Sequence, residues 1–207
     1  MKKLLAIAMV LALALTSVFA NAEKEAAPAA STGEVKYAKE ITILVAGGGS
    51  IVDPTNSWSA NDAVIRSNVF EGLMFYDVAK SETSLLLAKV CEFTDASCTK
   101  IHVVLRDDIY FSNGQKVTTA DVQYSFDRQK YSSMTASYAG CEIVSDTEMY
   151  INLKAGNAAF IDMLGNDYCA IICKSAAEAD PNNVGTIGTG PYVYDMNSYV
   201  AANKIDV

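Results

Sequence analysis

The 207-residue chain contains a single histidine, His102, and no Cys-x-x-Cys pair. Zinc sites of the usual kind need several Cys or His ligands at short spacing, so we expect no metal site. No Gly-x-Ser-x-Gly segment or nucleophilic cysteine signature accompanies His102, and the glycines at 47–49 lack the Lys-Ser/Thr of a phosphate loop. The sequence therefore predicts no catalytic residue and no cofactor, and it favours a binding protein over an enzyme.

Basic residues are also scarce, because 16 Lys and Arg face 24 Asp and Glu and the formal net charge is -8. Proteins that bind phosphate backbones need clustered Lys and Arg, which this sequence does not show. A nucleic-acid partner is therefore not expected.

The one long apolar run, residues 4–15, lies behind Lys2 and Lys3 and is followed by Ala20 and Ala22. A run this short with a small-x-small site after it predicts a secretory signal peptide at 1–22. Cleavage after Ala22 removes two lysines and moves the net charge from -8 to -10. Export predicts a location in the periplasm or on the extracellular face of the cytoplasmic membrane. A flexible tether is expected at 23–39, and the folded part at 40–207.

Five cysteines leave at least one thiol unpaired within the chain, in a compartment where oxidation is possible. A hairpin turn centred on residues 94–95 would place Cys91 opposite Cys98, so we expect a disulfide between them. The pairing of the other three stays open: Cys141, Cys169 and Cys173.

Strand-like and helix-like patterns alternate along the rest of the chain. Apolar and alternating runs predict strands at 41–45 and 73–77 and hairpins at 90–105 and 142–153. Ser59 and Thr118 have the form of helix N-caps, each with an Asp three residues on, and Asn-Gly predicts a tight turn at 111–114. This mixture indicates an α/β (mixed α+β) class.

Four segments, 67–77, 87–106, 111–128 and 188–192, together resemble the family 5 extracellular solute-binding proteins, which include dipeptide, oligopeptide and nickel carriers of ABC importers. The most specific block is 111–128, which contains Phe-x-Asn-Gly-x-x-Val-Thr and Ala-Asp-Val-x-Tyr-Ser-Phe-x-Arg. Residues 50–54 are similar to the family's Ser-Leu-Asp-Pro segment with one extra residue.

The resemblance implies a periplasmic-binding-protein-like clamshell, of which this chain holds the first, discontinuous lobe with an appended subdomain at about 70–180, truncated before the second lobe. It implies a monomeric substrate-binding component that captures peptides or a related small solute and delivers them to a membrane permease. A single lobe is expected to bind peptide weakly, because closure of two lobes excludes water from the ligand. Peptide, nickel chelate and oligosaccharide stay open as ligands. The alternatives are a truncated non-transporting relative and a secreted hydrolase.

A ligand site of this kind needs backbone donors and acceptors at loops together with aromatic walls. Tyr76 is one of several aromatic residues that could line a cleft. The candidate ligand-binding residues are Gly48, Gly49, Ser50, Ile51, Trp58, Gly188, Thr189, Gly190 and Tyr192.

Overall fold

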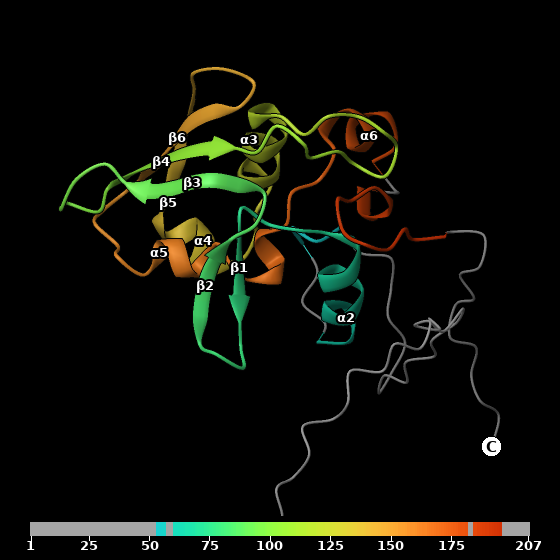
Figure 1. Cartoon of the computed structure of the whole chain (residues 1–207), viewed down its shortest axis with the longest axis horizontal. Coiled ribbons are helices and arrows are strands. Elements are labelled where there is room, and N and C mark those ends of the chain that lie inside the picture. The colour runs from blue at the N-terminus through green and yellow to red at the C-terminus, as the bar shows by residue number, and fades with distance from the viewer. Residues whose placement is uncertain (1–52, 57–59, 182–183, 196–207) are drawn as a thin grey trace, which may run out of the picture. The chain divides into compact units, whose positions relative to one another are not determined.

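The structure is a computed structural model, and it describes residues 53–56, 60–181 and 184–195 (Figure 1). The predicted signal peptide, the tether and the strand at 41–45 lie outside the described residues, as do five of the candidate ligand-binding residues: Gly48, Gly49, Ser50, Ile51 and Trp58.

Two antiparallel sheets form the β part of the fold, a pair β1-β2 and a four-stranded sheet with the order β3-β4-β6-β5. The strands are β1 (Met74–Asp77), β2 (Glu82–Leu85), β3 (Ala88–Phe93), β4 (Lys100–Leu105), β5 (Tyr138–Ile143) and β6 (Glu148–Leu153). The helices are α2 (Ala60–Val69), α3 (Thr119–Asp127), α4 (Ser132–Ser137), α5 (Phe160–Met163) and α6 (Lys174–Ala179), with 3-10 turns η1 (Asp167–Cys169) and η2 (Val184–Thr186). The mixed α/β class is confirmed.

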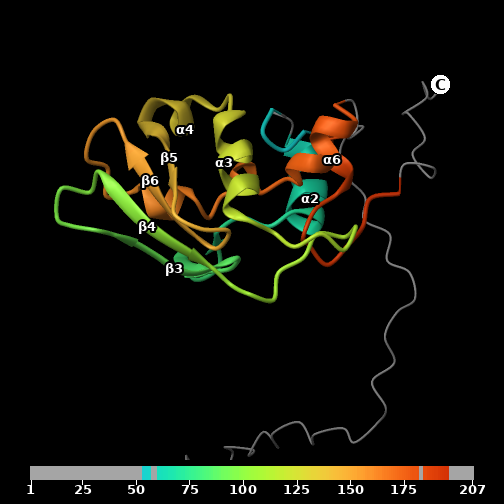
Figure 2. The ribbon, with the colours of Figure 1, turned by 90° about the horizontal axis from the view of Figure 1, so that it is seen from above.

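The main core lies between the four-stranded sheet and helices that cover one of its faces (Figure 2). Burial alternates strictly along β4 and β6, where Ile101 and Val103 on β4 face the same core as Met149 and Ile151 on β6. Successive strand residues point to opposite faces, so one face of each strand is apolar and the other is polar. Phe126 of α3 is fully buried against this apolar face.

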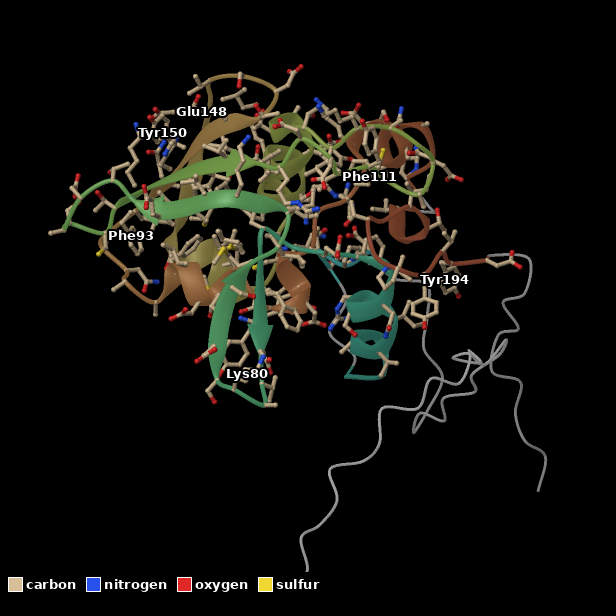
Figure 3. All side chains as sticks on the ribbon, in the orientation of Figure 1. Lys80, Phe93, Phe111, Glu148, Tyr150 and Tyr194 are labelled. Atoms are coloured by element: carbon tan, nitrogen blue, oxygen red, sulfur yellow. The ribbon has the colours of Figure 1, made fainter. Side chains whose placement is uncertain are left out.

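The polar face of the same sheet carries a cross-strand network that includes His102, Glu148 and Tyr150. Figure 3 labels Glu148 and Tyr150. His102 stacks on Tyr150 with ring centroids 5.1 Å apart, and its Nε2 lies 2.9 Å from Glu148 Oε1. Lys100 Nζ lies 4.5 Å from the centre of the Tyr150 ring and 2.7 Å from Glu142 Oε2. Such pairs stabilise neighbouring strands, so His102 contributes to the structure of the sheet.

Helix α3 begins at the predicted cap. The Asp121 Oδ2 accepts hydrogen bonds from the backbone nitrogen and the hydroxyl of Thr118, at 2.9 and 2.8 Å, which forms a capping box. Asp121 Oδ1 also accepts from the backbone nitrogen of Lys174 at 2.9 Å. The Ser125 hydroxyl one turn later accepts from the backbone nitrogen of Ile172 at 2.9 Å. Polar groups of α3 therefore hold the first residue of α6 and the segment just before it.

The predicted Cys91–Cys98 disulfide is wrong. The β3-β4 register pairs Cys91 with Val103, and the last pair before the loop is Phe93 with Ile101. Cys98 lies in that loop with a φ of 51°, and both thiols are free. The reason is the length of the loop. It spans residues 94–99, whereas the prediction assumed a tight turn centred on residues 94–95.

The predicted tight turn at 111–114 is confirmed. The backbone nitrogen of Gly114 donates to the carbonyl of Phe111 at 2.8 Å, and Gly114 has a φ of 83°. This left-handed conformation favours glycine, since a Cβ atom would crowd the backbone. The hairpin at 142–153 is also present, as β5 and β6.

Candidate ligand-binding groove

A groove of about 850 Å³ lies between helix α2 and the β1-β2 hairpin, which stand beside each other in Figure 1. Its walls include Ala63, Val64 and Ser67 of α2 and Phe75, Tyr76 and Val78 of the hairpin. Phe75 is 49% exposed and Val78 is 79% exposed, although both are apolar. Pockets of this size with apolar walls and few polar groups are typical of small-ligand sites.

Helix α2 is held at the floor of the groove by a partly buried ion pair. Arg66 Nη2 and Nε lie 2.7 and 2.9 Å from Asp167 Oδ2, and the Arg66 side chain is only 6% exposed. Arg66 Nη1 is buried and has no hydrogen-bond partner in the described part of the chain. A buried charge is tolerated when it is paired, so removing Asp167 would leave an uncompensated guanidinium.

The hairpin is held at the same floor by its backbone. Tyr76 donates its N–H to the carbonyl of Gly165 at 3.2 Å. A Cβ atom at Gly165 would lie 2.9 Å from the Tyr76 nitrogen, so only glycine permits this approach. The loop at 165–167 therefore fixes both walls.

Three carboxylates line the groove, and no Lys, Arg or His is among its lining residues in the described part of the chain. Asp77 pairs with Lys80 at 3.0 Å, and this hydrogen bond lowers the pKa of Asp77. Asp167 pairs with Arg66. Glu71, which is partly buried, makes no side-chain hydrogen bond or ion pair within the described residues.

The predicted site segment at 188–192 reaches the groove at Pro191 and also closes the end of α2. Gly190 and Tyr192 donate their N–H groups to the carbonyls of Val69 and Asn68, at 2.9 and 3.2 Å. These carbonyls belong to the last turn of the helix, where backbone carbonyls have no hydrogen-bond donors within the helix itself. Two of the predicted ligand donors are thus used within the protein.

Close backbone packing explains the two glycines of this segment. A Cβ atom at Gly188 would lie 2.0 Å from the Val69 carbonyl oxygen, and one at Gly190 would lie 2.6 Å from that of Asn68. The side chains of Thr189 and Tyr192 make no such contact: the Thr189 hydroxyl is buried without a hydrogen-bond partner among the described residues, and Tyr192 is 57% exposed. A ligand-binding role for the four residues stays a prediction.

The Asp53 loop, which belongs to the segment at 50–54, is anchored to the end of α3. Asp53 forms an ion pair with Arg128, and its Oδ1 accepts from the Thr55 nitrogen at 3.0 Å. Burial opposes the charge of Arg128, but the hydrogen bond and the charge of Asp53 outweigh this and raise its pKa. Arg128 also lies 5.3 Å from the ring of Tyr124. Two of the segments that carry the family resemblance therefore meet in space.

The sequence predictions missed most of the groove, including Asp167 and the residues after β1. One signal was available, because Met74, Phe75 and Tyr76 are consecutive and apolar, so both faces of that strand require cover. Within the described residues there is no group of three or more His, Cys, Asp or Glu that could hold a metal ion.

Comparison with known proteins shows the family of this chain. The family model of the bacterial extracellular solute-binding proteins, family 5 Middle, matches residues 82–205, and the chain belongs to this family. Among the helices that the structure describes, none is long and apolar enough to cross a membrane.

A curated relative is the glutathione-binding protein GsiB of Escherichia coli K12, which is 26% identical over 167 residues, or 76% of this chain and 32% of that protein. Among solved structures, NikZ of Campylobacter jejuni in complex with Ni(L-His) is 26% identical with a TM-score of 0.62, covering 73% of this chain and 32% of NikZ. The DppA protein of Helicobacter pylori in complex with the peptide STSA gives 21% identity and a TM-score of 0.61, covering 71% of this chain and 35% of DppA, and this likeness concerns the fold alone. The chain spans about a third of the length of the curated relatives it matches.

Proposed function

We propose that this chain serves in the extracytoplasmic substrate-binding component of an ABC importer, which captures peptides or a related small solute and delivers them to a membrane permease. Residues 1–22 direct export and are removed. Residues 40–207 form the first lobe with its subdomain at about 70–180, and the protein acts as a monomer. Family membership over residues 82–205 is the observation that carries this proposal.

The α2-hairpin groove supports the binding role, because it combines exposed aromatic walls with a few polar groups and a floor of fixed geometry. Its volume of about 850 Å³ suits a ligand of the size of a short peptide. Peptides are favoured among the possible solutes, since the relatives bind glutathione, which is a tripeptide, the peptide STSA and a histidine complex of nickel.

The test is NMR titration of the ¹⁵N-labelled mature chain with a pool of di- to tetrapeptides, with glutathione and with Ni²⁺-histidine. We expect the peptide pool to shift amide resonances of the groove, including those of Val64 and Gly72. Phe75→Ala removes one exposed aromatic wall and is expected to weaken this binding about tenfold. Tyr110→Ala is the matched control, because Tyr110 is a similarly exposed aromatic (54%) outside the groove.

Chromatography of the same mixtures after incubation separates binding from catalysis. Recovery of intact peptides is expected. Peptide cleavage would point to the secreted hydrolase instead, and the absence of any shift with all three ligand sets would contradict a binding role for this chain.

A further inference from the structure

We propose that a second cavity, between the β1-β2 hairpin and α5, binds a neutral saccharide of the size of a monosaccharide. The cavity has a volume of about 430 Å³, and the two elements that enclose it stand beside each other in Figure 1. Six residues line it: Tyr76, Ser81, Thr83, Asp162, Met163 and Asn166. This site is additional to the α2-hairpin groove, and its occupancy does not depend on the proposed function.

The hairpin presents three hydroxyl groups to the cavity. Tyr76 pairs with Thr83 across β1 and β2, so their side chains lie next to each other on one face of the hairpin. Ser81 stands just before β2 with a φ of 55°, a left-handed conformation that is costly for a residue with a Cβ atom. Strained backbone of this kind gathers at ligand sites. None of the three hydroxyls makes a hydrogen bond within the described part of the chain.

The opposite wall adds a carboxylate and an amide. The Asp162 carboxylate makes no hydrogen bond or ion pair with any described residue. Asn166 Nδ2 donates to the carbonyl of Met163 at 2.9 Å, which leaves its Oδ1 as an acceptor. The backbone N–H of Tyr76 donates to the carbonyl of Gly165 at 3.2 Å and fixes the two walls relative to each other. Polar groups without protein partners therefore converge on a cavity of defined shape.

The mixture of donors and acceptors defines the ligand. Hydroxyls both donate and accept, whereas the carboxylate of Asp162 only accepts. A molecule with several hydroxyls matches this mixture, because each of its hydroxyls also donates and accepts. The exposed ring of Tyr76 and the thioether of Met163 supply apolar surface for the C–H face of a sugar ring. A cavity of this volume with a few placed polar groups is typical of small-ligand sites.

The charge of the cavity favours a neutral saccharide over a charged one. No Lys, Arg or His is among its lining residues in the described part of the chain, so Asp162 repels an anionic sugar. A cationic sugar gains little from Asp162, because this carboxylate is exposed and an exposed ion pair changes affinity by about fivefold at most. Several hydrogen bonds to ligand hydroxyls together contribute more than this single pair.

The test is NMR titration of the ¹⁵N-labelled mature chain with glucose, the methyl glycosides of glucose, galactose and mannose, cellobiose, methyl glucuronoside and glucosamine. A neutral glycoside is expected to shift the amides of Thr83, Met163 and Asn166 at millimolar concentrations. The glucuronoside should bind at least tenfold more weakly, and glucosamine within about fivefold of glucose. Equal affinity for cellobiose would assign the end of a longer glycan as the ligand, whereas tenfold weaker binding would assign a free monosaccharide.

Two variants remove single polar groups without disturbing the fold. Thr83→Val deletes a hydroxyl that makes no protein contact and should weaken binding of the glycoside about fivefold. Asp162→Ala deletes the carboxylate and should weaken it about tenfold. Ser84→Ala removes a neighbouring hydroxyl on the opposite face of β2, and Asp146→Ala removes an exposed carboxylate elsewhere, so neither control should change the affinity.

The same variants separate this cavity from the groove. Thr83→Val and Asp162→Ala should leave the peptide-induced shifts at Val64 and Gly72 unchanged, because neither residue lines the groove. The saccharide site would be overturned by the absence of shifts with every neutral sugar up to about 100 mM, by tenfold tighter binding of a charged sugar, or by unchanged affinity in both variants. Each of these results leaves peptide binding standing, and failure of every peptide to bind would refute the proposed function alone.

Discussion

Replacement of Asp121 by alanine tests whether the most specific family motif has a structural purpose. The side chain of Asp121 is 8% exposed and accepts three hydrogen bonds, two from Thr118 and one from the backbone of Lys174. Asp121→Ala would remove the helix cap and the link between α3 and α6 at once. Two backbone N–H groups would lose their acceptor.

The magnitude follows from these contacts. Loss of a helix cap costs about 1 kcal/mol, and loss of a hydrogen bond to a charged group costs about 1.5–3 kcal/mol. We expect Asp121→Ala to lower the free energy of unfolding by about 3 kcal/mol, a large share of the roughly 5–15 kcal/mol typical of a domain. Asp121→Asn retains one acceptor oxygen, so about half of this loss is expected.

Urea unfolding followed by circular dichroism measures the effect. With an m-value of about 2 kcal/mol/M, the midpoint should fall by about 1.5 M. Asp146→Ala is the control, because this exposed carboxylate makes no side-chain hydrogen bond within the described residues, and it should stay within about 0.5 kcal/mol of the parent. A similarly small change in Asp121→Ala would refute the structural reading of the motif.

Three further predictions concern close packing, thiol reactivity and the anchored loop. Gly188→Ala should lower the free energy of unfolding in urea by about 2–3 kcal/mol, because its Cβ would overlap a helix carbonyl. Gly114→Ala should lower it by about 1–2 kcal/mol, since only its positive φ is strained. Equal losses in the two variants would contradict this explanation. Burial raises the pKa of both Cys91 and Cys141 to about 12, so at pH 8 their alkylation by iodoacetamide should be slow and should accelerate with rising pH or urea; rapid labelling of the folded chain would count against it. Arg128→Gln should lower the free energy of unfolding by no more than about 1 kcal/mol, because its ion pair with Asp53 is partly exposed. The same variant should be cleaved more readily by proteases near residues 53–56. An unchanged digestion pattern would argue that Arg128 does not anchor this loop.

Features that depend on neighbours in the chain were predictable from the sequence. The turn at 111–114 depends on one Asn-Gly step, and the cap of α3 depends on Thr118 and Asp121, which are three residues apart. The burial alternation of β4 follows from its own residue pattern. Local backbone preferences and periodicity decide such features, so a single sequence is sufficient to locate them.

Features that depend on register or on distant segments were decided by the tertiary structure. The prediction assumed too short a loop and therefore placed Cys91 opposite Cys98, whereas Cys91 pairs with Val103. The pairing across a hairpin changes with each residue in the turn. The groove joins α2 to the loop at 165–167, through an ion pair whose partners are 101 residues apart in sequence. Nothing near Arg66 in the sequence identifies Asp167 as its partner, because long-range contacts arise only when the whole core packs.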